Sequence, residues 1–197
     1  MLAGLVFFSA GNYSYSQTYV SGNVRGVWTP AGNPYIITDD TSIPIMDTLV
    51  IEAGVTIHIR GQFQLQVNGL LLVNGTVTDS VSFIPDSGNY WGGIRFLDGS
   101  DGRLTFARIE HSGSYDSLNG GGIGIYNSSP EIKSCTISGC RSNFGQTESG
   151  GGIYCRNSAA IIRNCLITEN EAKYGAGFAG ENFSGVFSGN IVSENSS

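Results

Sequence analysis

The chain has 197 residues, of which 40% are hydrophobic, 13% are charged and 29 are glycine. Chains that stay disordered combine low hydrophobicity with high charge, so this composition excludes intrinsic disorder and allows a buried core. The net charge is -6 and the ten Lys and Arg residues are scattered, which argues against a nucleic-acid-binding surface. The apolar run at 2–8 is far shorter than the roughly 20 residues that span a bilayer, so we expect no transmembrane helix.

The first 16 residues have the features of a secretory signal peptide that has lost its basic leader. An apolar run precedes the small residues Ser14 and Ser16, which favour cleavage before Gln17, and no Lys or Arg occurs before Arg25. The alternative is an ordinary N-terminal strand. The signal interpretation predicts an exported protein that is secreted or held at the cell surface. Residues 17–45, with three of the five prolines, are expected to cap the N-terminal end of the fold.

From residue 92 onward the chain repeats itself. A Gly-Gly-Ile motif recurs at steps of 29, 30 and 25 residues, loosened in its last copy, with its apolar residue at Ile94, Ile123, Ile153 and Phe178. A second block of residues follows each motif at nearly the same spacing. One position of this block is small or polar, and in the four copies it holds Ala107, Cys135, Cys165 and Asn190. Two landmarks that advance together indicate a structural unit of about 25–30 residues.

Each unit consists of short apolar runs separated by turn residues. Ile123 and Ile125 alternate with small or polar residues, a turn follows at 127–130, and a further run ends at Ile137. Runs this short are typical of strands, and no segment keeps helical spacing. One unit cannot bury its apolar side alone, but stacked units can. The sequence therefore predicts an all-β parallel β-helix over residues 46–197, with three short strands per coil.

The turns and the small inward positions support the stacking. Asn164 and Gly189 align at a corner that needs a left-handed backbone, together with Ser134. Asn170 and Asn195 align one strand later and predict a ladder of side chains bonding to neighbouring coils. Cys135 and Cys165 share an inward position, where stacked free thiols are expected; a disulfide between them is the alternative in an exported protein.

The C-terminal end is expected to be open. The last matching block ends at residue 192, so its inward residues Phe187, Ile191 or Val192 would meet water beside unpaired backbone groups. We expect the chain either to self-associate through this coil or to fray there. We also expect the natural product to continue with further repeats.

The segment Gly150–Asn170 carries Gly-Gly-Gly-Ile-Tyr and Asn-Cys-x-Ile-x-x-Asn, and it resembles the right-handed β-helix repeat proteins that bacteria secrete. Val20–Val24, Trp28 and Leu49–Val55 resemble the cap and first coil of these proteins. The Gly-Ile and terminal Asn pieces are similar to repeats of polymorphic outer-membrane proteins. The resemblance covers residues 17–197 and implies the pectin-lyase-like fold, a scaffold that carries lyases, hydrolases, adhesins and chains without known activity.

A glycoside hydrolase on this scaffold needs two or three carboxylates clustered on one face. The candidates on successive coils are Asp98, Asp101, Glu110 and Glu131. Asp98 and Asp101 each precede glycine, which favours a turn over a catalytic role. The Asn-Thr-Asp, Asp-Asp and Gly-His-Gly motifs that the resemblance to polygalacturonases would imply are missing from the helix region.

Lyases of this fold pair calcium-binding Asp residues with an Arg or Lys base. The resemblance therefore implies Arg95 and Arg108 as candidate bases, with Ca²⁺ held by Asp98 and Asp101. No calcium-loop spacing is present, so the preferred interpretation is surface ion pairs with no cofactor or metal. The two histidines, His58 and His111, are expected to be solvated because neither has a suitably spaced nucleophile or second metal ligand.

Aromatic residues recur at the strand starts and in the adjacent loops. A stacked outward row of rings could bind sugars, and its candidates are Tyr90, Trp91, Tyr126 and Tyr154. The alternative is that Trp91 covers the core and that the tyrosines are ordinary sheet residues. The leading functional hypothesis is a non-catalytic, adhesin-like scaffold that binds a polysaccharide or a cell-surface protein. The alternative is a polysaccharide lyase or glycoside hydrolase.

Overall fold

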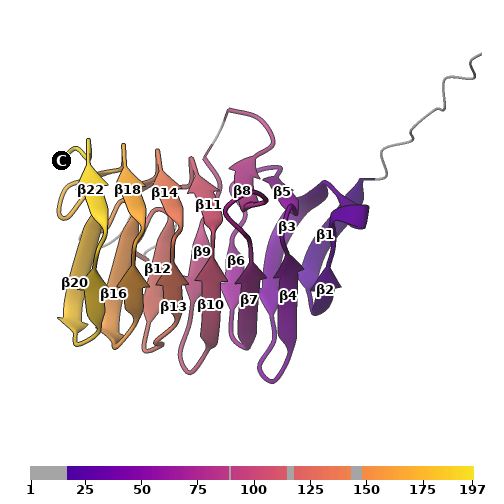
Figure 1. Ribbon diagram of the computed structural model, residues 1–197, viewed down its shortest axis with the longest axis horizontal. Helices are drawn as coiled ribbons and strands as arrows, with labels where there is room; N and C mark the ends of the chain where they lie inside the picture. Colours follow the sequence, from indigo (N-terminus) through magenta and orange to yellow (C-terminus); the bar gives the residue numbers. More distant parts are fainter. Residues whose placement is uncertain (1–16, 89, 115–117, 143–147) are drawn as a thin grey trace, which may run out of the picture.

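The computed structural model describes residues 17–88, 90–114, 118–142 and 148–197. The expected signal peptide at 1–16 lies outside these residues. The described part is an elongated stack of short strands with one 3-10 turn, η1 (Pro30–Gly32), and no α-helix (Figure 1). The all-β prediction is confirmed. No helix in this part is long and apolar enough to cross a membrane.

The middle of each coil contributes a strand to a seven-stranded sheet, which we call the second face. In spatial order it contains β2 (Gly26–Trp28), β4 (Thr48–Glu52), β7 (Leu70–Asn74), β10 (Asp101–Thr105), β13 (Glu131–Lys133), β17 (Ile161–Arg163) and β21 (Val186–Ser188).

A thirteen-stranded sheet forms the other two faces. The first face contains β6 (Leu65–Val67), β9 (Ile94–Phe96), β12 (Ile123–Tyr126), β16 (Ile153–Ser158) and β20 (Phe178–Phe183). The third face contains β5 (Thr56–Ile59), β8 (Val81–Pro85), β11 (Ala107–Glu110), β14 (Thr136–Ser138), β18 (Leu166–Thr168) and β22 (Ile191–Ser193). A separate pair consists of β15 (Arg141–Ser142) and β19 (Glu171–Ala172).

The strand β3 (Tyr35–Ile43) joins the first and third faces. Its start, Tyr35–Ile37, pairs with β5, whereas its end, Thr41–Ile43, pairs with β6. The strand β1 (Thr18–Asn23) pairs with β3. Residues 17–45, expected as a cap, therefore form strands that continue the parallel sheets. A stack between the rings of Trp28 and Tyr35, with centroids 4.6 Å apart, covers the first turn of the core.

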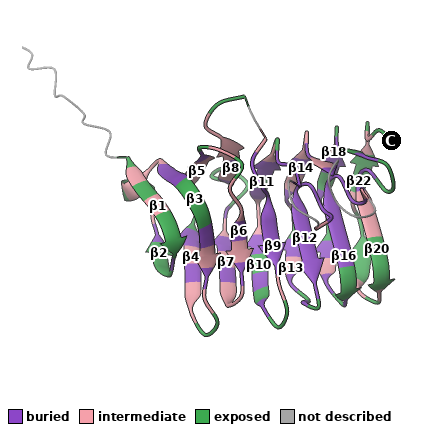
Figure 2. Ribbon diagram, turned by 180° about the vertical axis from the view of Figure 1, so that it is seen from behind, coloured by how far each residue is buried: buried purple, intermediate pink, exposed green. Residues whose placement is uncertain are grey.

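The register confirms the repeat predicted from the sequence. Ile123 pairs with both Ile94 and Ile153, and Ile153 pairs with Phe178. The named strand pairs are parallel, so each coil stacks on the one before it. Inward side chains form one apolar column through the coils, and Figure 2 shows the buried centre of the stack. The stacking therefore buries what a single coil would expose.

Left-handed residues recur at the corners, as the sequence indicated. Ser134, Asn164 and Gly189 have φ of 54°, 55° and 66°. The same conformation recurs between the third face and the following segment at His111, Gly139, Glu169 and Glu194. A glutamate in a sequence does not indicate a left-handed backbone. The sequence therefore does not predict this second row of corners.

The predicted asparagine ladder is present inside the stack. The Oδ1 atom of Asn170 accepts a bond from the backbone N–H of Cys140 at 3.0 Å, and its Nδ2 donates to the carbonyl of Ile137 at 3.0 Å. The Oδ1 atom of Asn195 accepts from the N–H of Asn170 at 3.0 Å, and its Nδ2 donates to Ile167 at 2.9 Å. Each amide thus links one coil to the coil before it.

The last coil leaves core-facing residues in contact with water, as expected. Phe187 pairs with the buried Ile162, and Val192 pairs with the buried Ile167. Phe187 is nevertheless 36% exposed and Val192 is 48% exposed, and the outward Ile191 is 64% exposed. The exposed colouring at β20 in Figure 2 belongs to the same coil.

All four cysteines are free and buried, so the free-thiol interpretation is confirmed over the disulfide alternative. Burial raises the pKa of Cys140 to about 11 and that of Cys155 to about 12. A hydrogen bond with Cys165 raises the pKa of Cys135.

Because all four thiols are buried, we expect the native chain to react negligibly with a disulfide reagent such as DTNB at pH 8. Four thiols per chain should react after denaturation. Rapid reaction of any thiol in the native chain would contradict the buried column.

Candidate functional site

The catalytic candidates from the sequence lie on different faces and do not converge. Arg95 is on β9 in the first face, Asp101 and Glu131 are on the second face, and Arg108 and Glu110 are on β11 in the third face. Arg95 was expected at the surface, but it is fully buried, and its Nη1 atom donates to the carbonyl of Ile94 at 3.2 Å. Glu110, the ion-pair partner of Arg108, lines a groove on the third face, whereas Asp101 lines a separate pocket of about 330 Å³.

Asp98 lies in a turn, and Asp101 is the first residue of β10. The Oδ1 atom of Asp98 accepts a bond from the side chain of Asn127 at 2.7 Å, and the Oδ1 atom of Asp101 accepts from the N–H of Gly102 at 2.7 Å. No group of three or more His, Cys, Asp or Glu side chains able to hold a metal ion occurs among the residues that the structure describes. These contacts give the calcium hypothesis no support.

A groove of about 310 Å³ lies on the third face beside the loop at 86–93. It is lined by Ile84, Pro85, Gly88, Glu110 and His111. Ile84 lies on β8 next to His58 of β5, because these two residues are register partners. Glu110 ends the adjacent strand β11, whose earlier residues pair with β8. The groove therefore combines an apolar wall from β8 with a carboxylate and an imidazole from the next coil.

Trp91 anchors the loop that borders this groove. Its indole Nε1–H donates to the carbonyl of Glu110 at 2.9 Å, and its ring stacks on Phe83 with centroids 6.3 Å apart. The carbonyl of Trp91 also accepts from the N–H of Gly113 at 2.7 Å. Trp91 is fully buried, so it holds the loop against the core and fixes the shape of the groove.

An ion-pair cluster around Asp86 and a separate pair between Arg108 and Glu110 flank the groove. Arg60 Nε lies 2.6 Å from Asp86 Oδ2, and His58 Nδ1 lies 3.5 Å from Asp86 Oδ1. The hydrogen bond from Arg60 lowers the pKa of Asp86, and the same bond raises the pKa of Arg60. Asp86 is therefore held in its ionised form at neutral pH.

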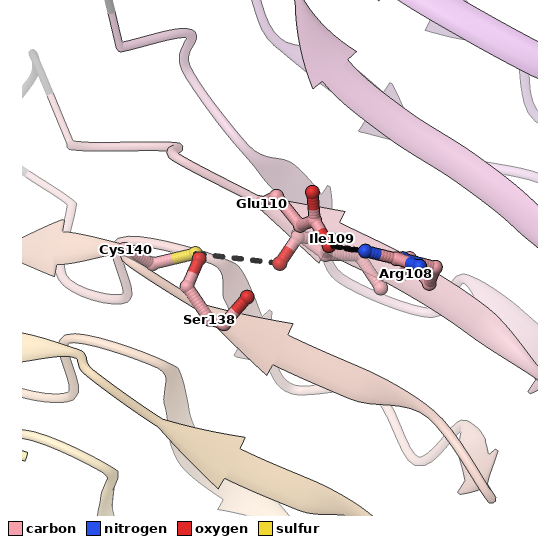
Figure 3. Close-up of polar contacts among 5 residues, drawn as sticks. All are labelled: Arg108, Ile109, Glu110, Ser138 and Cys140. Carbon is pink, nitrogen blue, oxygen red and sulfur yellow. Dashed lines mark hydrogen bonds and ion pairs between the residues drawn. The ribbon is translucent and has the colours of Figure 1, made fainter. Parts of the chain in front are cut away.

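The second pair joins Arg108 to Glu110 on the outer side of β11. The Oε1 atom of Glu110 accepts from Arg108 Nε at 2.9 Å and from Arg108 Nη2 at 2.5 Å. Figure 3 shows this pair on β11 and the neighbouring Cys140 thiol, whose sulfur lies 3.7 Å from the carbonyl of Ile109. The thiol also reaches the carbonyl of Ser138 at 3.3 Å. Cys140 thus supports the strand from the buried side and does not open into the groove.

The aromatic candidates do not form an exposed row. Trp91, Tyr126 and Tyr154 are 0%, 3% and 4% exposed, contrary to the outward arrangement considered from the sequence. The hydroxyl of Tyr126 donates to the carbonyl of Asn119 and that of Tyr154 donates to Glu181, and strand alternation alone does not reveal these contacts. Tyr90 is half-buried under the guanidinium of Arg141, which lies 3.6 Å from the ring centroid. A ligand contact by Tyr90 stays a prediction.

The lowered pKa of Asp86 predicts how its ion pair contributes to stability. Because the folded-state pKa is below the ordinary aspartate pKa of 3.8, the contribution is present above that value and is lost as pH falls through the folded pKa. We expect Asp86→Asn to be slightly less stable than wild type at pH 7, with the difference shrinking as the pH falls below 3.8. Thermal melting between pH 7 and acid pH tests it, with Glu171→Gln as the control. A stability difference that is the same at acid pH as at pH 7 would refute it.

Comparison with known families agrees with the fold. A family model described as "Right handed beta helix region" matches residues 70–197, which is well over half of the chain. No curated protein and no solved structure matches the chain. The matched residues include β11 and every residue that lines the groove.

Proposed function

We propose that this chain, which belongs to the right-handed β-helix family, is a non-catalytic scaffold. Its groove is presented to a polysaccharide or a surface protein outside the cell. The groove supplies an apolar wall at Ile84 and Pro85 and polar groups at Glu110 and His111. Such a mixture of apolar and hydrogen-bonding groups suits a sugar ring or an extended peptide.

The observation that carries this proposal is the state of the carboxylates near the groove. A glycoside hydrolase needs one carboxyl whose pKa is raised so that it can act as an acid. The pKa of Asp86 is lowered instead, and Glu110 accepts two bonds from Arg108. The Asp86 carboxylate therefore favours its charged form over proton transfer, and the Glu110 carboxylate is engaged by Arg108.

One observation favours the alternative of a lyase or hydrolase. The groove region brings together Glu110, His111 and Arg108, and these residue types serve as acids and bases in many enzymes. An enzyme would be expected to use this groove. A turnover measurement therefore separates the two functions.

The binding proposal is tested by filling the groove. Gly88 lines it, and a Cβ atom at Gly88 would meet nothing within 4 Å, so Gly88→Trp should fold and block the groove. Thr78→Trp, in the exposed turn before β8, is the matched control. In calorimetric titrations with neutral and uronate-containing oligosaccharides, we expect Gly88→Trp to weaken binding about tenfold or more. Equal binding by both variants, or no binding by the wild type, would overturn the groove as the sugar-binding site.

The exposure of Phe187 and Val192 supports a further expectation, that the backbone of their coil opens more readily than that of the coils before it. The exposed inward residues Phe187 and Val192 lack a covering coil among the described residues. Protection from hydrogen exchange should therefore fall from the coil of Ile153 to the coil of Val192. Uniform protection as far as Asn190 in a monomer would contradict it.

A further inference from the structure

The second face carries a row of outward residues with an unusual order. One residue from each strand is in register along this row. In spatial order the residues are Val27, Val50, Leu72, Arg103, Glu131, Ile161 and Val186. Five of the seven are apolar although the row points away from the core. Val27 is 55% exposed and Val186 is 37% exposed.

If the order of the strands is reversed, the row matches itself with apolar residues facing apolar residues and opposite charges facing each other. About a midpoint between β10 and β13, Arg103 is matched by Glu131, Leu72 by Ile161, and Val50 by Val186. An outward apolar row interrupted by one cation and one anion is therefore able to face an inverted copy of itself. Apolar outward patches on soluble proteins commonly mark interaction surfaces.

The two charged residues are available to a partner. Arg103 and Glu131 are register partners on adjacent strands. Among the ion pairs of the described residues, however, neither of them takes part. Arg103 is exposed and Glu131 is half-buried.

We propose that the second face binds a second copy of this chain, with the two solenoids antiparallel. The two-fold axis runs along the strand direction between β10 and β13. Arg103 of each copy then meets Glu131 of the other, and the apolar residues on both sides of the charges become covered. A parallel arrangement would place Arg103 against Arg103, and like charges in contact are unfavourable.

A neighbouring outward row on the same face supports the antiparallel order. It has an acid on β4, Glu52, and bases on β13 and β17, Lys133 and Arg163. The proposed symmetry places β4 of one copy over β21 of the other, so Glu52 lies one strand away from Arg163 of the other copy. Seven strands spaced by about 4.8 Å give a face about 30 Å long, which is small for an interface. We therefore expect a weak, concentration-dependent dimer.

Charge reversal tests the central contacts. Arg103→Glu and Glu131→Arg each place like charges across the interface, and we expect each to weaken dimerisation about tenfold or more. The double variant restores opposite charges and should recover dimerisation to within about threefold of wild type. Lys173→Glu, an exposed charge outside the second face, is the control. Sedimentation velocity from micromolar to millimolar protein gives the affinities, and circular dichroism verifies folding.

Disulfide trapping tests the orientation without relying on charge. A chain with Val50→Cys should cross-link to a chain with Val186→Cys when the two are mixed, because the native thiols are buried. Cross-linking of Val50→Cys only to itself would overturn the antiparallel arrangement. A monomer at every concentration, or a dimer unaffected by the charge reversals, would overturn the proposal. The second of these results would favour the open C-terminal coil as the contact instead.

Discussion

Replacing Gly121 with alanine is expected to lower the free energy of unfolding by about 3 kcal/mol or more. A Cβ atom at Gly121 would collide with the carbonyl oxygens of Arg141 and Gly151, one in its own coil and one in the next. Its backbone is not left-handed, so the cost is purely steric. For a chain of this size such a loss lowers Tm by about 6–12 °C.

The matched control is Gly88→Ala. A Cβ atom at this glycine meets nothing within 4 Å, and its φ is not positive, so we expect a change within about 0.5 kcal/mol. Thermal melting and urea denaturation of both variants measure the difference. Equal stability of Gly121→Ala and Gly88→Ala would show that the glycine motif does not permit close stacking in the way described.

Replacing Asn170 with alanine is the second large effect that we expect. Asn170 is fully buried, and its amide satisfies the N–H of Cys140 and the carbonyl of Ile137. Alanine would leave both backbone groups buried without these partners, which costs about 2–4 kcal/mol. Urea denaturation of the variant and the wild type measures the loss.

Asn195→Ala is the control that separates two effects: the loss of the amide hydrogen bonds, and the burial of the backbone groups left without a partner. Asn195 makes the same two kinds of bond, to the N–H of Asn170 and the carbonyl of Ile167, but it is half-buried in the last coil. Water can replace its bonds, so we expect a loss of at most about 1 kcal/mol. If both variants lost the same stability, burial of the ladder would not be what makes Asn170 important.

The fold was largely predictable because its information is repeated in the sequence. Every coil needs the same inward apolar positions, and Ile94, Ile123 and Ile153 therefore recur at nearly constant spacing. Corners such as Asn164 and Gly189 were also readable, since few residue types accept a left-handed backbone. The number of residues between equivalent positions then fixes which residues pair in neighbouring coils.

The candidate site was harder to predict because it depends on departures from the repeat. No repeated pattern predicts that Trp91 folds inward, where its indole N–H donates to the carbonyl of Glu110. A row of exposed side chains that begins at the carboxylate of Asp98 and continues through the amides of Asn127, Asn157 and Asn182 was missed for a different reason. These residues align across coils, but each also fits an ordinary turn.

The central functional claim is that the groove binds a ligand without converting it. The most direct test is a turnover assay of the purified chain on uronate-containing and neutral polysaccharides, with and without calcium. We predict that the wild type forms no more product than a Glu110→Gln, Arg108→Gln double variant does. Sustained product formation by the wild type that this double variant abolishes, with its folding intact, would contradict the claim and make the groove an active site.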